Sequence, residues 1–416
     1  MSWQACRLGD VMTLKRGHDL PEHSRQDGDV PVVSSSGITG RHKEAKAKAP
    51  GVVTGRYGTI GEVFYLEEDY WPLNTALYVI DFKGNDPRFS AYFLRNILKD
   101  YQSEKAAVPG VDRNVLHEIK VRAPDHASQR RISDILATYD DLIENNRRRM
   151  ALLEESARLL YCEWFVRLRF PGHEHTRITD GVPEGWARKT ALDAVSVLSG
   201  GTPKTSVPDY WDGEIPFYTP KDATDGIWVT DCERTVTELG LKNCNSKLYP
   251  RETVFISARG TVGKLNMAHR PMAMSQSCYA LVGKDHLTQP FVYAAIQSAV
   301  DALRQQAVGA VFDAIVVDTF KRINLMIPPP AMLRLFDETV CPIFEQVENL
   351  TLQNQKLRAA RDLLLPRLMN GGIAVCPSKT NTPTANPCAP SPASQPIGMP
   401  WRRTACASPI VRAAAC

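Results

Sequence analysis

The peptide "TGRYGTIG" at Thr54–Gly61 has a close echo, "SARGTVG", about two hundred residues later at Ser257–Gly263. A single Gly-rich loop is weak evidence of anything, but this repetition continues beyond the loop. "NTALYV" at Asn74–Val79 returns as "SQSCYAL" at Ser275–Leu281. Self-similarity over about half of a chain is typical of two copies of one structural module.

Each copy mixes short strands with one helix. "GVVTG", "EVFYL" and "ALYVI" are rich in β-forming residues and bounded by Gly, Pro or Asn, so we predict strands. "DPRFSAYFLRNILKDY" and its counterpart "QPFVYAAIQSAVDAL" predict a helix near the end of each copy. A strand, not a helix, follows the glycines of the first loop. A phosphate-cradling loop is therefore disfavoured, and we expect the glycines to let the backbone turn tightly.

A long helical segment follows each copy and carries apolar residues at alternating spacings of four and three, the pattern of a coiled-coil seam. The first seam is Ile132, Leu136, Tyr139, Ile143, Asn146, Met150, Leu153, Ala157, Leu160 and Trp164. The second is Phe336, Val340, Ile343, Val347, Leu350, Asn354, Leu357, Arg361, Leu364 and Leu368. We expect the two helices to pack on each other, with Asn146 and Asn354 setting the register. Two helices packed on their own modules are the alternative. Pro342 is expected to kink or break the second helix near Thr339.

These patterns predict an α+β fold: two tandem recognition modules with curled, mostly antiparallel sheets, and two long helices related by a pseudo-twofold repeat. We predict six segments, which are a first module at 1–124, a spacer helix at 125–168, a linker at 169–182, a second module at 183–328, a second spacer helix at 329–371 and a tail at 372–416. The tail is rich in Pro, Ala, Ser and Thr, which predicts disorder.

Composition narrows the class of protein. The chain has 416 residues and a formal net charge of +4, and four bases in the acid-free tail account for the whole excess. Affinity for nucleic acid must therefore come from local clusters or a partner. There is no apolar signal core or membrane-length apolar run, so we expect a cytoplasmic protein. The ten cysteines form no C-x-x-C pair, and we expect no metal site, with His173 and His175 as a polar linker.

Motifs for catalysis are missing from the sequence. It contains no Walker-type phosphate loop, no G-x-S-x-G elbow and no Asp/Asn-Pro-Pro-aromatic tetrapeptide of amino-methyltransferases. Two loop-bearing modules joined by two matched helices instead suggest a reader of two separated sites on duplex DNA. Lys, Arg, Ser, Thr and Tyr beside glycines suit phosphate contacts and base-edge readout.

Three sets of phrases along residues 1–371 point to a known family. The first half contains "PVVSSSGITG", "GRYGTIGEVFY" and "WPLNTALYV". The second half contains "GWARKTALDAVSVLSGGTPKT", "YWDGEIPFYTPKD" and "ISARGTVGK". The helical segments contain "QRRISDILATYDDLIENNRRRMALLEESARLLYCEWF" and "NQKLRAARDLLLPRLMNG". In these phrases the chain resembles the specificity subunits of type I restriction–modification systems.

The resemblance implies a non-catalytic subunit that binds double-stranded DNA and reads a bipartite site with its two modules. The helices would form an antiparallel coiled coil that sets the spacer between the half-sites and docks partners. The implied partners are two modification (methyltransferase) subunits, which use S-adenosylmethionine to methylate adenine N6, and restriction (helicase–nuclease) subunits, which use ATP and Mg²⁺. No cofactor is expected in this chain.

Candidate DNA contacts lie in or beside the Gly-containing loops. They are Ser34, Ser35, Ser36, Arg41, Arg56, Tyr57 and Thr59 in the first module, and Thr219, Lys221, Asp222, Arg259, Thr261 and Lys264 in the second. Each could equally be a surface residue that keeps a loop soluble. The Arg is displaced by one place between the two loops, since Arg56 aligns with Ala258 and Tyr57 with Arg259.

A stand-alone sequence-specific DNA-binding regulator is the alternative function, although a lone binder usually shows a basic face. A protein-binding scaffold and a catalytic methyltransferase are weaker alternatives. If the helices act as a ruler, four residues inserted after Trp164 are expected to lengthen the spacer.

Overall fold

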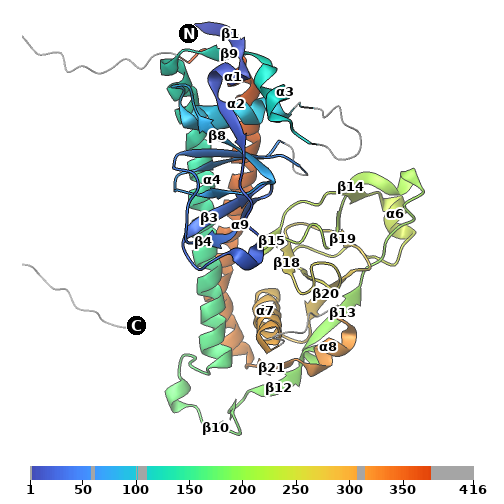
Figure 1. Ribbon diagram of the computed structural model, residues 1–416. Helices are drawn as coiled ribbons and strands as arrows, with labels where there is room; N and C mark the ends of the chain where they lie inside the picture. Colours follow the sequence, from blue (N-terminus) through green and yellow to red (C-terminus); the bar gives the residue numbers. More distant parts are fainter. Residues whose placement is uncertain (1, 58–60, 100, 102–109, 307–313, 376–416) are drawn as a thin grey trace, which may run out of the picture. The chain divides into compact units, whose positions relative to one another are not determined.

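The computed structural model describes residues 2–57, 61–99, 101, 110–306 and 314–375 (Figure 1). In the described part of the first module, the strands form a four-stranded sheet in the order β2-β8-β5-β6, a three-stranded sheet β4-β3-β7 and the pair β1-β9. The strands are β1 (Trp3–Arg7), β2 (Thr13–Arg16), β3 (Val30–Ser34), β4 (Gly37–His42), β5 (Gly51–Gly55), β6 (Val63–Leu66), β7 (Trp71–Pro72), β8 (Ala76–Asp81) and β9 (Lys120–Pro124). The helices are α1 (Leu8–Val11), α2 (Pro87–Lys99) and α3 (Arg113–Glu118).

The second module repeats this topology. Its described strands form the sheet β13-β20-β17-β18-β15, the sheet β16-β14-β19 and the pair β12-β21. The strands are β12 (Ala187–Thr190), β13 (Val195–Ser199), β14 (Trp211–Tyr218), β15 (Trp228–Val229), β16 (Thr235–Val236), β17 (Val254–Ser257), β18 (Leu265–Ala268), β19 (Ala273–Met274), β20 (Cys278–Gly283) and β21 (Asn324–Ile327). The helices are α5 (Ala191–Ala194), α6 (Glu238–Lys242), α7 (Gln289–Gln306) and α8 (Val317–Arg322). A short hairpin of β10 (Ile178–Thr179) and β11 (Val182–Pro183) precedes it. The predicted internal repeat is therefore confirmed.

One helix in each module covers the main sheet. In the first module, Phe89 and Leu94 of α2 join a buried core with Val52 and Leu77 of the sheet. In the second, Phe291 of α7 does the same against its own sheet. Burying such a side chain contributes about 1.5–3 kcal/mol relative to leaving it in water. The strands and helices predicted from sequence are present, and most strand pairs are antiparallel.

The helices α4 (His126–Tyr161) and α9 (Pro330–Met369) run side by side (Figure 1). In the side-chain contacts between them, residue numbers increase along α4 while those of their partners decrease along α9. Asp140 meets Arg361 at 2.5 Å, Asn146 meets Asn354 at 3.0 Å, and Met150 meets Thr351. The helices are therefore antiparallel. None of the twenty predicted seam side chains is exposed, so the predicted coiled-coil packing is confirmed.

Two polar pairs interrupt the apolar seam between α4 and α9, a buried pair of asparagines and a half-buried ion pair. Asn146 donates its amide to the Asn354 side-chain oxygen, and Asn354 donates to the Ile143 carbonyl at 3.2 Å. The second pair is Asp140 with Arg361. Because the two seams are offset by 204 residues, the same antiparallel register can be applied to two copies of one helix. Two α4 helices would place Asn146 against Met150 and Asp140 against Ala157.

Two α9 helices would place Asn354 against Leu350 and Arg361 against Phe344. Each homotypic pairing therefore sets a buried asparagine against an apolar side chain, which is costly. The polar residues of the seam therefore favour pairing of α4 with α9 over pairing of either helix with a second copy of itself.

Replacing Asn354 with Leu should lower the free energy of unfolding by about 1–3 kcal/mol, because Asn146 would keep a buried amide without its partner. The double variant Asn146→Leu/Asn354→Leu should recover most of that loss, since both polar groups are removed. Chemical denaturation of the two variants and the wild type measures the difference. A single variant as stable as the wild type would show that the Asn pair carries no polar constraint.

One expectation about the helices needs correction. The kink or break expected near Thr339 is wrong as a break, because α9 is continuous through Pro342. Phe336 and Val340 of the seam and the adjacent Phe344 are buried on both sides of Pro342 and hold the helix together despite the missing N–H. The first helix ends in a π-helical turn at Cys162–Val166, which buries Phe165.

Within the described residues, no helix is long and apolar enough to span a membrane. Most of the predicted tail, residues 376–416, lies outside the described residues.

Candidate nucleic-acid interface

The two Gly-containing loops occupy the same place in both modules. Each follows a buried central strand, β5 or β17, and the backbone N–H next to the strand end donates to an equivalent carbonyl. Arg56 N donates to Thr75 O at 2.9 Å, and Ala258 N donates to Ser277 O at 2.8 Å. Gly260 has a φ of +80°, which L side chains rarely adopt. The expectation that these glycines let the backbone turn is confirmed for the second loop.

In the first module, several predicted contacts are used in local structure. Ser34 Oγ lies 3.0 Å from Ser36 Oγ, and it also donates to the Gly37 carbonyl across the β3–β4 turn. Ser35, the remaining serine of this run, lies at the tip of the same turn. Arg41 donates to the Asp29 carbonyl. The hydrogen bonds of Ser34 and Arg41 stabilise the hairpin itself, so these two side chains are poorer candidates for DNA contact.

Arg56 and Tyr57 are the better candidates of the first module. The Arg56 guanidinium carbon lies 4.7 Å from the centroid of the Tyr57 ring, a cation–π contact that fixes both groups. The Tyr57 side chain is exposed at the loop. Thr59 lies outside the described residues.

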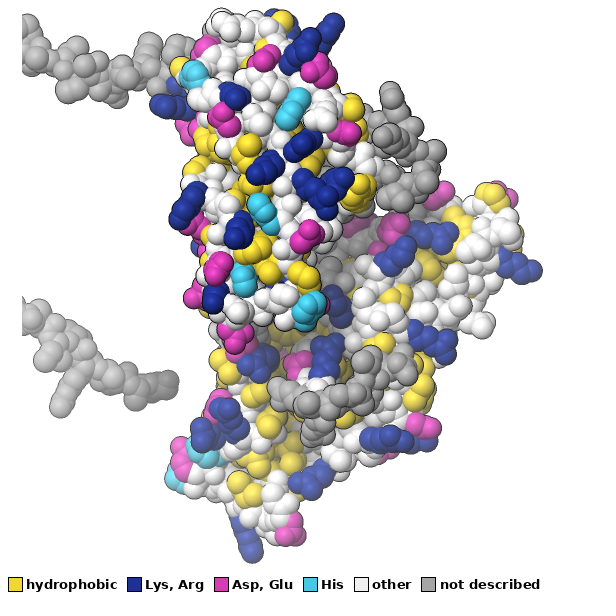
Figure 2. Space-filling view, in the orientation of Figure 1, with side chains coloured by type: hydrophobic (Ala, Val, Ile, Leu, Met, Phe, Trp, Pro, Cys, Tyr) yellow, Lys and Arg dark blue, Asp and Glu magenta, His cyan; other side chains and the backbone are white. Residues whose placement is uncertain are grey.

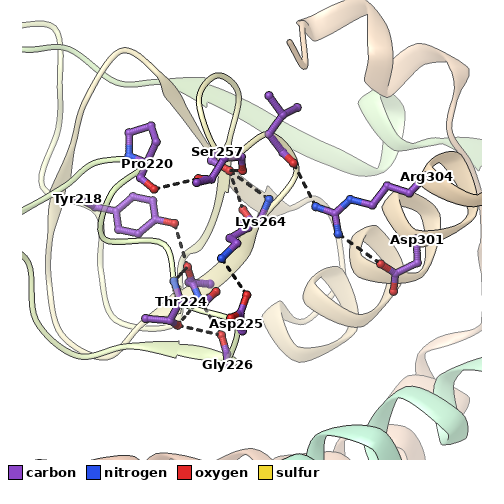
Figure 3. A network of polar contacts seen from close by, with 12 residues as sticks. Tyr218, Pro220, Thr224, Asp225, Gly226, Ser257, Lys264, Asp301 and Arg304 are labelled. Carbon is purple, nitrogen blue, oxygen red and sulfur yellow. Dashed lines mark hydrogen bonds and ion pairs between the residues drawn. The ribbon is translucent and has the colours of Figure 1, made fainter. Parts of the chain in front are cut away.

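In the second module, four of the six predicted residues hold the loops together. Thr219 Oγ1 donates to Asp222 at 2.7 Å, and Asp222 also accepts from the Glu233 N–H. Thr261 Oγ1 donates to the Pro220 carbonyl at 2.9 Å. Figure 3 shows Lys264 directed at Asp225, with 2.8 Å between Nζ and Oδ1.

The other two predicted residues, Lys221 and Arg259, are exposed cations at these loops, and neither makes an ion pair within the described part of the chain. Of the six predicted residues, these two are the cations that stay free to meet a ligand within the described part of the chain.

A buried asparagine that sequence reasoning missed supports the second-module loop. Asn266 of β18 accepts from the Tyr218 hydroxyl at 2.9 Å and donates to the Gly226 carbonyl at 2.6 Å (Figure 3). The same loop reaches the helix pair, because Glu154 of α4 accepts from Ile227 N at 3.1 Å. Burial raises the pKa of Glu154, and the Ile227 N–H opposes that rise. A polar residue within the buried strand "LNMA" was the available signal.

Two arginines of the first module were also missed. Arg16, at the end of β2, and Arg113, at the start of α3, line a cavity of about 430 Å³ together with Arg56, Tyr57, Gly110 and Asp112. Both are exposed and make no ion pair within the described residues. Figure 2 shows Lys and Arg side chains spread over the near face of the first module, with His side chains between them. The sequence repeat could have drawn attention to Arg16, because Arg16 precedes Gly17, the counterpart of Gly200 in the second module.

A histidine links β2 and α3, the two elements that contribute Arg16 and Arg113 to this cavity. His117 of α3 accepts a hydrogen bond at Nε2 from the Leu14 N–H of β2, at 2.9 Å. Burial lowers the pKa of His117, and the positive charge of Arg113 lowers it further. A protonated ring could not accept this bond. The stabilisation is therefore complete above the unfolded-state pKa of about 6.5 and is lost as the pH falls toward the lower folded-state value.

We expect the melting temperature of the wild type to fall between about pH 7.5 and about pH 5.5. His117→Ala should melt lower than the wild type at the higher pH and show a smaller decline. His23→Ala, which removes an exposed histidine of the same module, should keep the full decline. An identical pH profile in His117→Ala would show that the bond to Leu14 does not contribute.

This architecture is that of a DNA-reading subunit built from two equivalent modules on one helix pair. A family model for the type I restriction modification DNA specificity domain matches residues 1–155 and 183–360. The chain therefore belongs to the type I restriction–modification DNA specificity family, which confirms the resemblance seen in the sequence.

Individual relatives agree with this assignment. The chain is 22% identical to the type I restriction enzyme HindI specificity subunit of Haemophilus influenzae, over 89% of this chain and 99% of that protein. It is 25% identical to the MjaIX specificity subunit of Methanocaldococcus jannaschii, over 69% of this chain and 68% of that protein. The crystal structure of a type I S subunit from M. genitalium has a TM-score of 0.54 at 15% identity, covering 88% of this chain and 96% of that chain, and shows the shared fold.

Proposed function

We propose that this chain is the DNA specificity subunit of a type I restriction–modification complex and reads a bipartite site with one module for each half. The repetition carries this proposal. Two modules of one topology place a cation at the same Gly-containing loop, the half-buried Arg56 in the first and the exposed Arg259 in the second, and both modules pack on one antiparallel helix pair. Guanidinium and ammonium groups are the common donors to phosphate oxygens and guanine edges.

The helix pair would set the spacer between the half-sites. Tyr92 of α2 attaches the first module to Asp140 of α4 at 2.5 Å. The second module attaches elsewhere along the pair, where Trp228 Nε1 donates to the Phe344 carbonyl at 2.9 Å. Gln355 also donates to Thr230 Oγ1 at 2.6 Å. With each module held by different segments, the register of α4 and α9 would define the distance that the protein measures.

The outer surface of the helix pair would dock the other subunits. Leu142, Leu152 and Leu159 of α4 and Leu363 of α9 are exposed, and Leu152 is 70% exposed. Exposed leucines along a coiled coil suit apolar contact with partner proteins. Two modification subunits carrying S-adenosylmethionine, and restriction subunits carrying ATP and Mg²⁺, are the proposed partners. This chain would add no catalytic group. Because its proposed ligand is chromosomal DNA, it would act in the cytoplasm.

Co-expression with the cognate modification subunit, followed by genome-wide mapping of methylated adenine, tests the function. We expect one asymmetric bipartite sequence to be methylated, and no methylation by this chain alone. Specific DNA binding by the chain with no methylation in the presence of the modification subunit would instead support a stand-alone regulator.

Within that experiment, Arg259→Ala should relax one position of one half-sequence and leave the other half unchanged. A bidentate contact of arginine with guanine discriminates by about 1–3 kcal/mol. Lys242→Ala, which removes an exposed cation on α6 of the same module, is the matched control and should leave the methylated sequence unchanged. A uniform loss of methylation at all sites would place Arg259 on phosphate alone.

A further inference from the structure

In the described part of the second module, the positions that correspond to the cavity residues Arg16, Arg56 and Arg113 carry no cation. The backbone gives the equivalent positions directly. Arg16 pairs with Leu77 across β2 and β8, and Ser199 pairs with Tyr279 across β13 and β20. The next residues, Gly17 and Gly200, each lie where a Cβ would fall 2.2 Å from the carbonyl oxygen of Leu73 or Ser275. Arg16 therefore corresponds to Ser199.

The other two arginines are replaced in the same way. Val111 N donates to Arg56 O at 2.8 Å, and Ile315 N donates to Ala258 O at 2.9 Å, so Arg56 corresponds to Ala258. Arg113 is the first residue of α3, and its counterpart Val317 is the first residue of α8. Three guanidinium groups in the first module thus correspond to a hydroxyl and two apolar side chains in the second.

Among the described residues, the lining of the first-module cavity has too little negative charge to balance its arginines. Asp112 is the acidic residue of its lining, and its carboxylate already accepts from the Asn114 N–H at 2.9 Å as the N-cap of α3. Arg16 and Arg113 keep their donors free within the described part of the chain. Three guanidinium groups repel one another unless an acceptor-rich group lies between them. DNA offers two such groups, the phosphate oxygens and the O6/N7 edge of guanine.

We infer that the first module reads its half-site through this three-arginine cavity, with Arg16 and Arg113 as specificity or affinity determinants that donate to a DNA acceptor, and that the second module reads without one. The inference rests on the proposed function and assigns different chemistry to its two modules. In the second module, the Gly-containing loop offers the exposed Arg259, and the start of α8 offers the exposed apolar residues Val316 and Val317.

The test uses the full chain in complex with its modification subunit. In Arg16→Ala/Arg113→Ala, we expect the second half-sequence and the spacer to persist and recognition of the first half-sequence to change. If the acceptor is guanine, preference at one position of the first half should fall by about tenfold to a hundredfold. Arg122→Ala, which removes another exposed arginine of the first module, should methylate the wild-type sequence. Arg16→Gln/Arg113→Gln keeps polarity at both positions and replaces the Ala variant if that variant melts early.

Two further measurements separate phosphate from guanine. Arg16→Lys/Arg113→Lys keeps the charge but loses the bidentate fork, so it should restore a phosphate contact and fail to restore a guanine contact. If phosphate is the acceptor, the Ala variant should bind all sequences more weakly. The slope of log K against log salt concentration should then become shallower by about 0.9 for each lost contact.

Unchanged affinity, salt slope and methylated sequence in the Ala or Gln variant would overturn the inference. That result leaves the proposed function intact, because the wild-type complex would still methylate a bipartite site. Failure of the wild-type complex to methylate any bipartite site would overturn the function itself.

Discussion

Seven residues inserted into α4 after Leu142, together with seven inserted into α9 after Leu357, should lengthen the spacer of the methylated site by about three base pairs. Seven helical residues add about 10.5 Å, and base pairs stack about 3.4 Å apart. One heptad preserves the phase of the seam. Both half-sequences should persist, since neither insertion touches a module.

The positions of the two insertions follow from the contacts along the helix pair. The first module holds Asp140 of α4, whose seam partner is Arg361 of α9. The second module holds Glu154 of α4 and Gln355 of α9. Insertions after Leu142 and Leu357 fall between these two sets of contacts on both helices, so each set stays whole.

An insertion after Trp164, the position that the sequence suggested, would behave differently. It falls inside the π-helical turn Cys162–Val166 and would displace Phe165 from the second-module core. We therefore expect the four-residue insertion there to destabilise the chain instead of lengthening the spacer.

The single insertion after Leu142 is the control for the matched pair. It shifts one seam against the other and separates Asn146 from Asn354, so it should lower stability and abolish methylation. Mapping of methylated adenines and thermal melting compare the single-insertion variant, the double-insertion variant and the wild type. An unchanged spacer in an active double-insertion variant would show that the helix pair does not set the distance.

Arg251→Ala should lower the free energy of unfolding by about 2–3 kcal/mol. Glu348 of α9 is 9% exposed at its side chain and receives both Arg251 Nη1 at 2.6 Å and Nη2 at 2.8 Å. His269 Nδ1 lies 2.5 Å from the same carboxylate. Removing one partner of a buried pair costs about 3–5 kcal/mol, and the lower figure applies because Arg251 is 43% exposed and reached by water.

The double variant Arg251→Met/Glu348→Leu distinguishes the loss of the ion-pair attraction from the cost of leaving the Glu348 carboxylate buried without a partner. It should recover most of the stability, because apolar residues can replace a buried ion pair at little cost. Arg270→Ala breaks an exposed pair with Asp231 and should cost less than about 1 kcal/mol. Chemical denaturation at neutral pH measures all three. A small effect of Arg251→Ala would show that water already satisfies Glu348.

The cluster of Arg251, His269 and Glu348 predicts that the protein loses stability at acid pH. Burial alone would raise the pKa of Glu348, but hydrogen bonds from Arg251 and His269 outweigh it and lower the pKa below its usual 4.5. The stability from this carboxylate is therefore complete above about pH 4.5 and is lost as the pH falls through the lower folded-state value. Arg251→Ala should lose this protection.

Much of the fold follows from local sequence patterns. Strand and helix periodicities, and the repetition of whole phrases, depend on residues near one another in the chain, so they predicted the repeated α+β modules and the seam. Asn146 and Asn354 each interrupt an apolar stripe, and that local signal placed them together in the antiparallel pair. The continuous helix through Pro342 shows the limit of this reasoning, because packing of Phe336, Val340 and Phe344 overrode a local propensity.

Only the tertiary structure decided which polar side chains are free to bind. Thr219, Thr261 and Lys264 have the residue types of DNA contacts, yet each is committed to a partner in its own or a neighbouring loop. Arg16 and Arg113 lie 97 residues apart and carry no motif, yet the fold brings them to one cavity. Hydrogen bonds and charges act over a few ångströms in space regardless of chain separation. A sequence therefore shows which donors a protein possesses, and only the folded chain shows which of them remain unpaired and converge.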